Sequence, residues 1–306
     1  MGESLLRLLR QLRPQEHDAA RVEDNTRDAA HESGSKLTSM GPLYRITCLD
    51  RPLTVTRRGQ RIETWPSRKA REALAFLATR PGCEATHDEL CDAIWPEREP
   101  ELAQRSLFSA MSSLRAILAA GEEDLTHNVA PLLARRHRYA LDSTWCAVDL
   151  ADLRRQRLTL RPDAEASAWF AVAQALEQPL LAGESFGWLP ALRRELRQWR
   201  REALAQALSQ AVANGETPLA ITIAQTMLDI DPLHETTVTL LMRLHLQRGE
   251  SAQAVTCYRA FRHALERKDC TTPDGANTPS AETRALYAVA CGCGLLPISE
   301  TSSDTS

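Results

Sequence analysis

Arg135, Arg136, His137 and Arg138 place four basic side chains in a row, with apolar residues on either side. The segment LLARRHRYALD (132–142) predicts a strand, a polar turn and a second strand. A two-stranded hairpin with arginines at its tip can set their guanidinium groups against phosphates or in a minor groove. A solvated turn that contacts nothing is the alternative interpretation.

A helix expected over 100–118 offers a second set of groups. Its apolar residues share one stripe at helical spacing, namely Ala103, Leu107, Ala110, Met111, Leu114 and Leu118. The opposite face is small and hydrogen-bonding, which lets a helix backbone approach base edges in a major groove. The candidate contact residues on or beside that face are Arg105, Phe108, Ser109, Ser112, Ser113 and Arg115. An ordinary solvated face with few charges is again the alternative.

The preceding elements must hold the helix and the hairpin at a fixed separation. Short apolar runs over 43–66 predict strands, with Arg58-Gly59-Gln60 as a hairpin turn. Three helical patterns follow, over 67–82, 86–95 and 100–118. Thr86 and Glu89 form a capping box at the start of the second. Sheet, three helices and hairpin, in this order, predict a winged helix in which the last two helices form the helix-turn-helix.

An internal repeat occupies the second half of the chain. NGETPLAIT (214–222) aligns with RGESAQAVT (248–256), an offset of 34 residues, which is the tetratricopeptide period. Gly215 matches Gly249 at the turn between paired helices, and Ala220 matches Ala254 where those helices approach closely. Stacked helix pairs of this kind present a concave surface suited to peptides, partner helices or a second protomer.

These patterns together predict a mostly α protein with an N-terminal winged helix and a following tetratricopeptide-like helical domain. We expect the winged helix over 42–143 and the helical domain over 144–292, with a short apolar turn near 145–153 between them. Residues 1–41 are expected to be a disordered linker that includes a short amphipathic helix in SLLRLLRQLR. Residues 293–306 are expected to be a disordered tail.

Composition limits the classes of function. The net charge of the 306-residue chain is −3, so any nucleic-acid site must be a local basic patch. Eight scattered cysteines indicate reduced thiols and therefore a cytoplasmic protein. The expected contact with DNA would make it nucleoid-associated. Cys291 and Cys293 lack a second pair, so neither a metal nor another cofactor is expected. No apolar run approaches the roughly 18 residues of a membrane span.

Six stretches in order resemble the SARP-type regulators, in which a winged helix is joined to a bacterial transcriptional activator domain. The stretches are SRKAREALAFLA, AQRSLFSAMSSLRAIL, RRHRYALD, AVDLADL, LEQPLLAGESFGWLPALRRELRQWRREAL and PSAETRALYAVA, and the resemblance runs from about 43 to 290. It implies binding of double-stranded DNA through the winged helix, often as a homodimer, and activation through RNA polymerase. Phe108 departs from the family pattern, which more often has a polar or basic residue there, and 269–281 is longer and more polar than usual.

Two other classes of function remain as alternatives. Gly183-Glu184-Ser185-Phe186-Gly187 matches the G-x-S-x-G pattern of a serine hydrolase. That pattern needs a strand before the serine and a parallel sheet beneath it, whereas a helical run precedes Ser185, so we expect no enzyme. The second alternative is a tetratricopeptide-type scaffold whose winged helix contacts protein instead of DNA.

Overall fold

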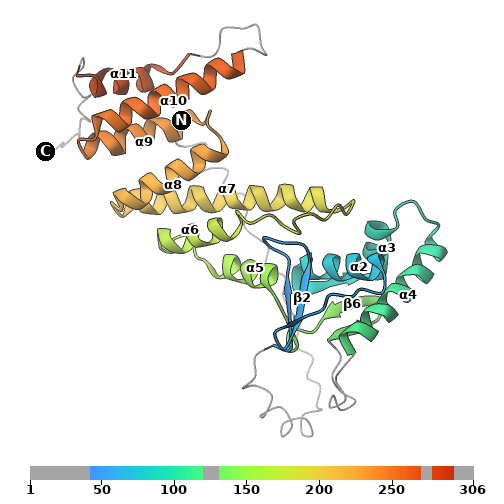
Figure 1. Ribbon diagram of the computed structural model, residues 1–306. Helices are drawn as coiled ribbons and strands as arrows, with labels where there is room; N and C mark the ends of the chain where they lie inside the picture. The colour runs from blue at the N-terminus through green and yellow to red at the C-terminus, as the bar shows by residue number, and fades with distance from the viewer. Residues whose placement is uncertain (1–41, 120–130, 270–277, 293–306) are drawn as a thin grey trace, which may run out of the picture. The chain divides into compact units, whose positions relative to one another are not determined.

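The computed structural model describes residues 42–119, 131–269 and 278–292 (Figure 1). All of them belong to one compact unit that begins at Pro42. The predicted linker and amphipathic helix over 1–41 and the predicted tail over 293–306 lie outside the described residues. The described elements are mostly helical with small sheets, which confirms the predicted fold class.

The first sheet begins as an antiparallel meander of β1 (Tyr44–Thr47), β2 (Thr54–Arg57) and β3 (Gln60–Arg61). Arg58 and Gly59 connect β2 to β3 with φ values of 46° and 83°. Positive φ at both turn residues matches the twist of a tight hairpin, and this turn was predicted.

A fourth strand completes this sheet. β7 (Cys146–Val148) lies parallel to β1, so the strand order is β3-β2-β1-β7. α5 (Asp149–Thr159) follows β7 directly. The expected apolar turn at 145–153 is therefore wrong: the segment is a strand that leads into a helix. Its three strand residues are too few to show a period, and their partner lies about a hundred positions earlier.

Three helices follow the meander: α2 (Arg68–Thr79), α3 (His87–Ile94) and α4 (Pro100–Ala119). Ser67 caps α2 by accepting a hydrogen bond from the Ala70 N–H. The predicted capping box of α3 is present, because Thr86 Oγ1 accepts from the Glu89 N–H and the Glu89 carboxylate accepts from the Thr86 N–H.

A second sheet forms the wing. β5 (Leu132–Arg135) and β6 (Arg138–Leu141) form the predicted hairpin, and β4 (Glu84–Thr86) pairs with the outer side of β6. The order is therefore β4-β6-β5. β4 follows η1 (Pro81–Cys83) and leads straight into α3, so the wing is hydrogen-bonded to the first turn of the helix-turn-helix.

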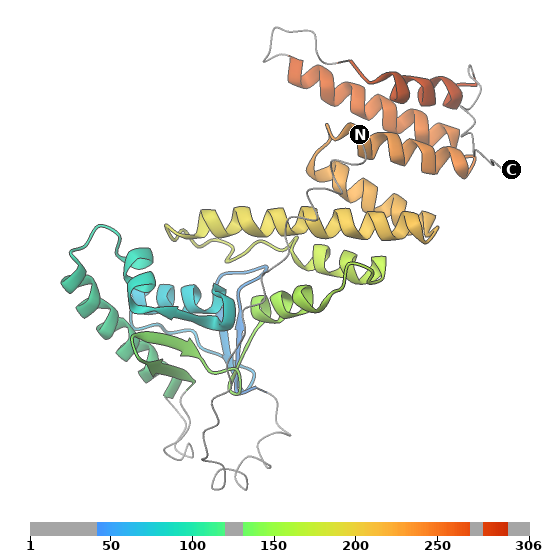
Figure 2. The ribbon, with the colours of Figure 1, turned by 180° about the vertical axis from the view of Figure 1, so that it is seen from behind.

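The helical half continues with α6 (Ala166–Ala175), α7 (Leu189–Ala213), α8 (Thr217–Ile230), α9 (Glu235–Gln247), α10 (Ser251–Asp269) and α11 (Ala281–Ala290). Successive helices pack on one another, and the long α7 lies between α6 and α8 in both views (Figures 1 and 2).

The turns of the two repeats have equivalent backbone hydrogen bonds. The Glu216 N–H donates to the Ala211 carbonyl and, 34 residues on, the Glu250 N–H donates to the His245 carbonyl, both at 2.8 Å. Gly215 and Gly249 precede these donors with φ values of 70° and 73°, which glycine adopts at little cost. The predicted 34-residue repeat therefore corresponds to two equivalent helix pairs.

The two halves share backbone hydrogen bonds at the end of β1. The Asp149 carboxylate accepts from the N–H groups of Cys48 and Leu49 at 2.9 Å. The Leu181 N–H donates to the Cys48 carbonyl, and Arg71 on α2 pairs with Glu184 at 2.6 Å. These contacts satisfy buried backbone groups, so the first sheet depends on residues from both halves of the chain.

Candidate nucleic-acid interface

The apolar stripe of α4 is buried, so the opposite face of the helix is exposed, as predicted. Ala103, Leu107, Ala110, Met111, Leu114 and Leu118 are buried, as expected. The exposed residues among the candidates are Arg105, Phe108, Ser109, Ser112 and Arg115. Ser113 is half-buried at the edge, where its hydroxyl donates to the Ser109 carbonyl at 3.0 Å. The face therefore combines two arginines, small hydroxyls and one phenyl ring.

The basic turn closes the hairpin with two residues. Arg136 and His137 have φ values of 36° and 64°, and Arg135 pairs with Arg138 across the turn. Asparagine and glycine are the usual residues at such positions, so an arginine and a histidine there hold backbone strain that functional sites often carry. All four basic side chains are exposed.

The three arginines of this turn are not equivalent. Arg138 forms an ion pair with Glu84 on β4. Within the described part of the chain, Arg135 and Arg136 form no ion pair, and both side chains are exposed. Because a carboxylate already offsets Arg138, the charge available to a polyanion is concentrated on Arg135 and Arg136.

His87, the first residue of α3, joins the wing to α4. Its backbone N–H donates to the His137 carbonyl at 2.9 Å, and its imidazole ring stacks on the Tyr139 ring with centroids 4.8 Å apart. The Phe108 ring of α4 meets the same imidazole edge-on at 5.6 Å. His87 therefore fixes the distance between the basic turn and the exposed face of α4.

The electrostatics of this cluster favour a neutral His87. Loss of solvent around the ring, and next the charge of His137, lower the pKa of His87 below its ordinary value. Burial raises the pKa of Tyr139, and the Arg115 guanidinium lies 5.6 Å from the Tyr139 ring, a cation–π distance. Arg115 is therefore held against the wing, at the side of α4 that carries Phe108.

Sequence reasoning missed His87, Glu84 and Tyr139. Only the pairing of β4 with β6 brings these residues beside the basic turn. The aromatic residue directly after RRHR was a usable signal for Tyr139, whereas His87 and Glu84 lie about fifty positions earlier and offered none.

The Gly183–Gly187 segment does not have the geometry of a nucleophile elbow. It lies in the turn region between α6 and α7, with no strand leading into Ser185. Phe186 is buried and stacks on Trp188, whose ring meets Phe76 of α2 edge-on at 5.2 Å. The segment therefore packs the start of the helical half against α2 of the winged helix.

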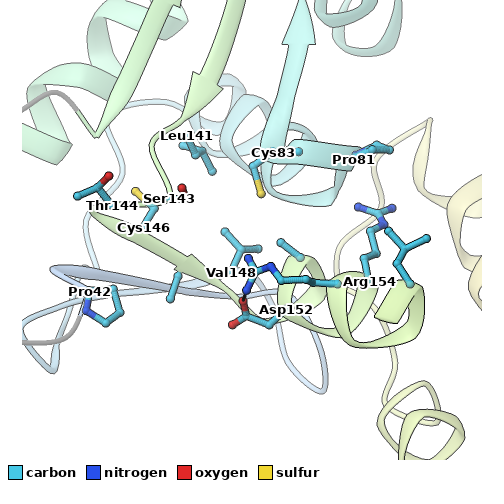
Figure 3. A pocket seen from close by; sticks show the side chains of 15 residues that line it. Pro42, Pro81, Cys83, Leu141, Ser143, Thr144, Cys146, Val148, Asp152 and Arg154 are labelled. Carbon is cyan, nitrogen blue, oxygen red and sulfur yellow. Dashed lines mark hydrogen bonds and ion pairs between the residues drawn. The ribbon is translucent and has the colours of Figure 1, made fainter. Parts of the chain in front are cut away.

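A cavity of about 560 Å³ lies beside the wing's base, between Leu141, Ser143 and Thr144 on one side and Val148, Asp152 and Arg154 on the other (Figure 3). Burial raises the pKa of Cys146 to about 12 and also raises that of Cys83, so both thiols in its wall stay protonated. Arg155 pairs with Asp152 at 3.1 Å. Arg154, the other charged side chain of the cavity wall, donates to the Thr79 carbonyl.

Within the three described ranges, no group of His, Cys, Asp and Glu side chains is arranged to hold a metal ion. None of the described helices combines the length and the apolar character that a bilayer crossing requires.

The fold places the chain in a class of two-part proteins, in which a winged helix is followed by a tetratricopeptide-like helical half. Residues 141–288 match the family model of the bacterial transcriptional activator domain. The chain thus carries a bacterial transcriptional activator domain over these residues, and the predicted resemblance to SARP-type regulators is confirmed.

One sequence relative and one solved structure of similar fold extend the match beyond that domain. Over 238 residues the chain is 29% identical to regulatory protein AfsR of Streptomyces coelicolor, an alignment that covers 70% of this chain and 21% of that protein. The chain therefore spans about a fifth of that relative. Mycobacterium tuberculosis EmbR, solved in complex with a low affinity phosphopeptide, has a similar fold with a TM-score of 0.56 and 21% identity, covering 83% of this chain and 66% of that one. The family model and the AfsR match are with proteins described as transcriptional activators or regulatory, whereas the EmbR match shows the fold alone.

Proposed function

We propose that this protein is a transcriptional activator that binds double-stranded DNA sequence-specifically, with α4 in the major groove and the wing on phosphates or in the minor groove. The observation that carries the proposal is that His87 contacts both parts of the site. It bonds to His137 and stacks on Tyr139 in the wing, and its ring meets Phe108 of α4 edge-on. A rigid separation between two contact points is what docking on a duplex of fixed groove spacing requires.

In this proposal the candidate residues divide into two groups. Arg105, Ser109 and Ser112 read or approach base edges, since they occupy the exposed outer face of α4, and Ser113 lies at the edge of that face. Arg135 and Arg136 contact phosphates without reading sequence. His137 and Arg138 lie beside them, and Arg138 contributes less because Glu84 offsets its charge.

The helical half is proposed to contact RNA polymerase or a second copy of the chain. The stacked pairs α7–α8 and α9–α10 support this role, because helical repeats present extended surfaces to protein partners. Since the two halves share hydrogen bonds at Asp149 and Leu181, a partner on the helical half would be held at a set distance from the DNA.

The test is an in vitro selection with the purified full-length chain and a random duplex library, followed by affinity measurements at several salt concentrations. Enrichment of a defined sequence whose affinity falls steeply with salt supports the proposal. If no duplex is enriched and the chain instead captures protein partners through the winged helix, the scaffold interpretation replaces it.

A further inference from the structure

Phe108 differs in chemistry from every other candidate on the outer face of α4. It is 48% exposed, and single exposed apolar side chains are common on protein surfaces. Two features set this one apart: it lies among residues proposed to face bases, and its ring is held edge-on by His87, which is itself stacked on Tyr139. The exposed side of the ring therefore has a defined direction.

A phenyl ring can recognise few groups in a major groove. It has no hydrogen-bond donor or acceptor, so it gains nothing from the polar edges of guanine, adenine or cytosine, nor from a phosphate. The 5-methyl group of thymine is the apolar group exposed there, and contact with it removes apolar surface from water. Insertion of an apolar side chain between bases is a minor-groove device and does not suit α4.

We propose that Phe108 is a specificity-determining residue that reads a thymine 5-methyl group, an inference that rests on the proposed DNA-binding function. Arg105 is three residues before Phe108 and Ser112 is four after it, so these side chains share one edge of the helix. The preferred site would then contain a thymine next to the base pairs that Arg105 and Ser112 approach. 5-Methylcytosine, which presents a methyl group at the same place, would satisfy the same ring.

Deoxyuridine provides the test, because it differs from thymidine only by this methyl group. The duplex selected by the full-length chain is resynthesised with dU in place of each dT in turn, and affinities are measured by fluorescence anisotropy. For the wild type, one position should weaken by about fourfold, the value expected for one buried methyl-sized group. The variant F108A should bind the dT and dU duplexes of that position equally.

Leu102 is the matched control, because it is an apolar residue of the same helix and is 52% exposed. L102A should keep the wild-type ratio between dT and dU affinities. Three results would overturn the inference while leaving DNA binding intact. The wild type could show no position at which dU weakens binding, F108A could keep the wild-type ratio of dT to dU affinities, or L102A could lose that ratio as F108A does. A chain that selects no duplex overturns the proposed function as well. The wild-type measurement does not depend on how well any variant folds.

Discussion

Arg138 of the wing forms an ion pair with Glu84, the first residue of the neighbouring strand β4. Both side chains are about half exposed, so the pair adds little to stability. Its consequence is electrostatic: it removes one of three arginines from the charge that the basic turn offers to phosphates.

Arginines of the same turn should therefore differ in their effect on salt dependence. Arg136→Ala should reduce the slope of log affinity against log salt by about one, the loss of one phosphate contact. Arg138→Ala should reduce it less, and Glu84→Gln should steepen it by releasing Arg138. Anisotropy titrations between about 50 and 200 mM salt measure all three slopes. Identical slopes for Arg136→Ala and the wild type would remove the wing from the interface.

Arg105→Ala should change sequence preference as well as affinity. A bidentate contact with guanine contributes about 1–3 kcal/mol of discrimination against other bases. Affinities for a panel of operator variants, measured in parallel, separate the two effects. Gln104→Ala, an exposed neighbour on the flank of α4, is the control. If the rank and spacing of affinities are unchanged in Arg105→Ala, Arg105 contacts backbone at most.

His87 should make the stability of the winged helix depend on pH. The pKa of His87 in the folded protein lies below the ordinary histidine value of 6.5, so on acidification the unfolded chain takes up the proton first. Stability is then lost as the pH falls below about 6.5 towards the folded pKa. His87→Phe keeps a ring against Tyr139 and Phe108 but cannot be protonated, and its Tm should fall less between about pH 7.5 and 5.5. Equal falls in the two proteins would contradict this role for His87.

Asp149→Ala should destabilise the first sheet and the junction together. The carboxylate accepts the N–H groups of Cys48, Leu49 and Leu150, and burial raises its pKa. Each buried donor left without a partner costs about 1–3 kcal/mol, so the loss in unfolding free energy should be several times that of a surface change. Asp152→Ala, on the exposed side of the same helix, is the control. Urea denaturation measures both, and similar losses would show that the Asp149 contacts are dispensable.

A serine-directed fluorophosphonate probe should leave Ser185 unlabelled. The exposed hydroxyl follows a turn instead of a strand, so it lacks the geometry that activates a hydrolase nucleophile. Labelling that disappears in Ser185→Ala would show the opposite.

The sequence by itself determined the elements whose signals are local. The stripe of α4, the capping box of Thr86 and Glu89, the basic hairpin and the 34-residue repeat are all visible because helical period, capping chemistry and turn residues act over short distances along the chain. They were enough to indicate a winged helix joined to repeats, and to name the side chains that could meet DNA.

Tertiary structure decided how those side chains are arranged. β7 joins β1 across about a hundred residues, and β4 brings Glu84 and His87 beside the wing. A strand of three residues has no readable period, and its partner is chosen by packing and by the demand that buried N–H groups be bonded. Therefore only the folded chain reveals that Arg138 is offset by Glu84, and that one imidazole ties the basic turn to Phe108.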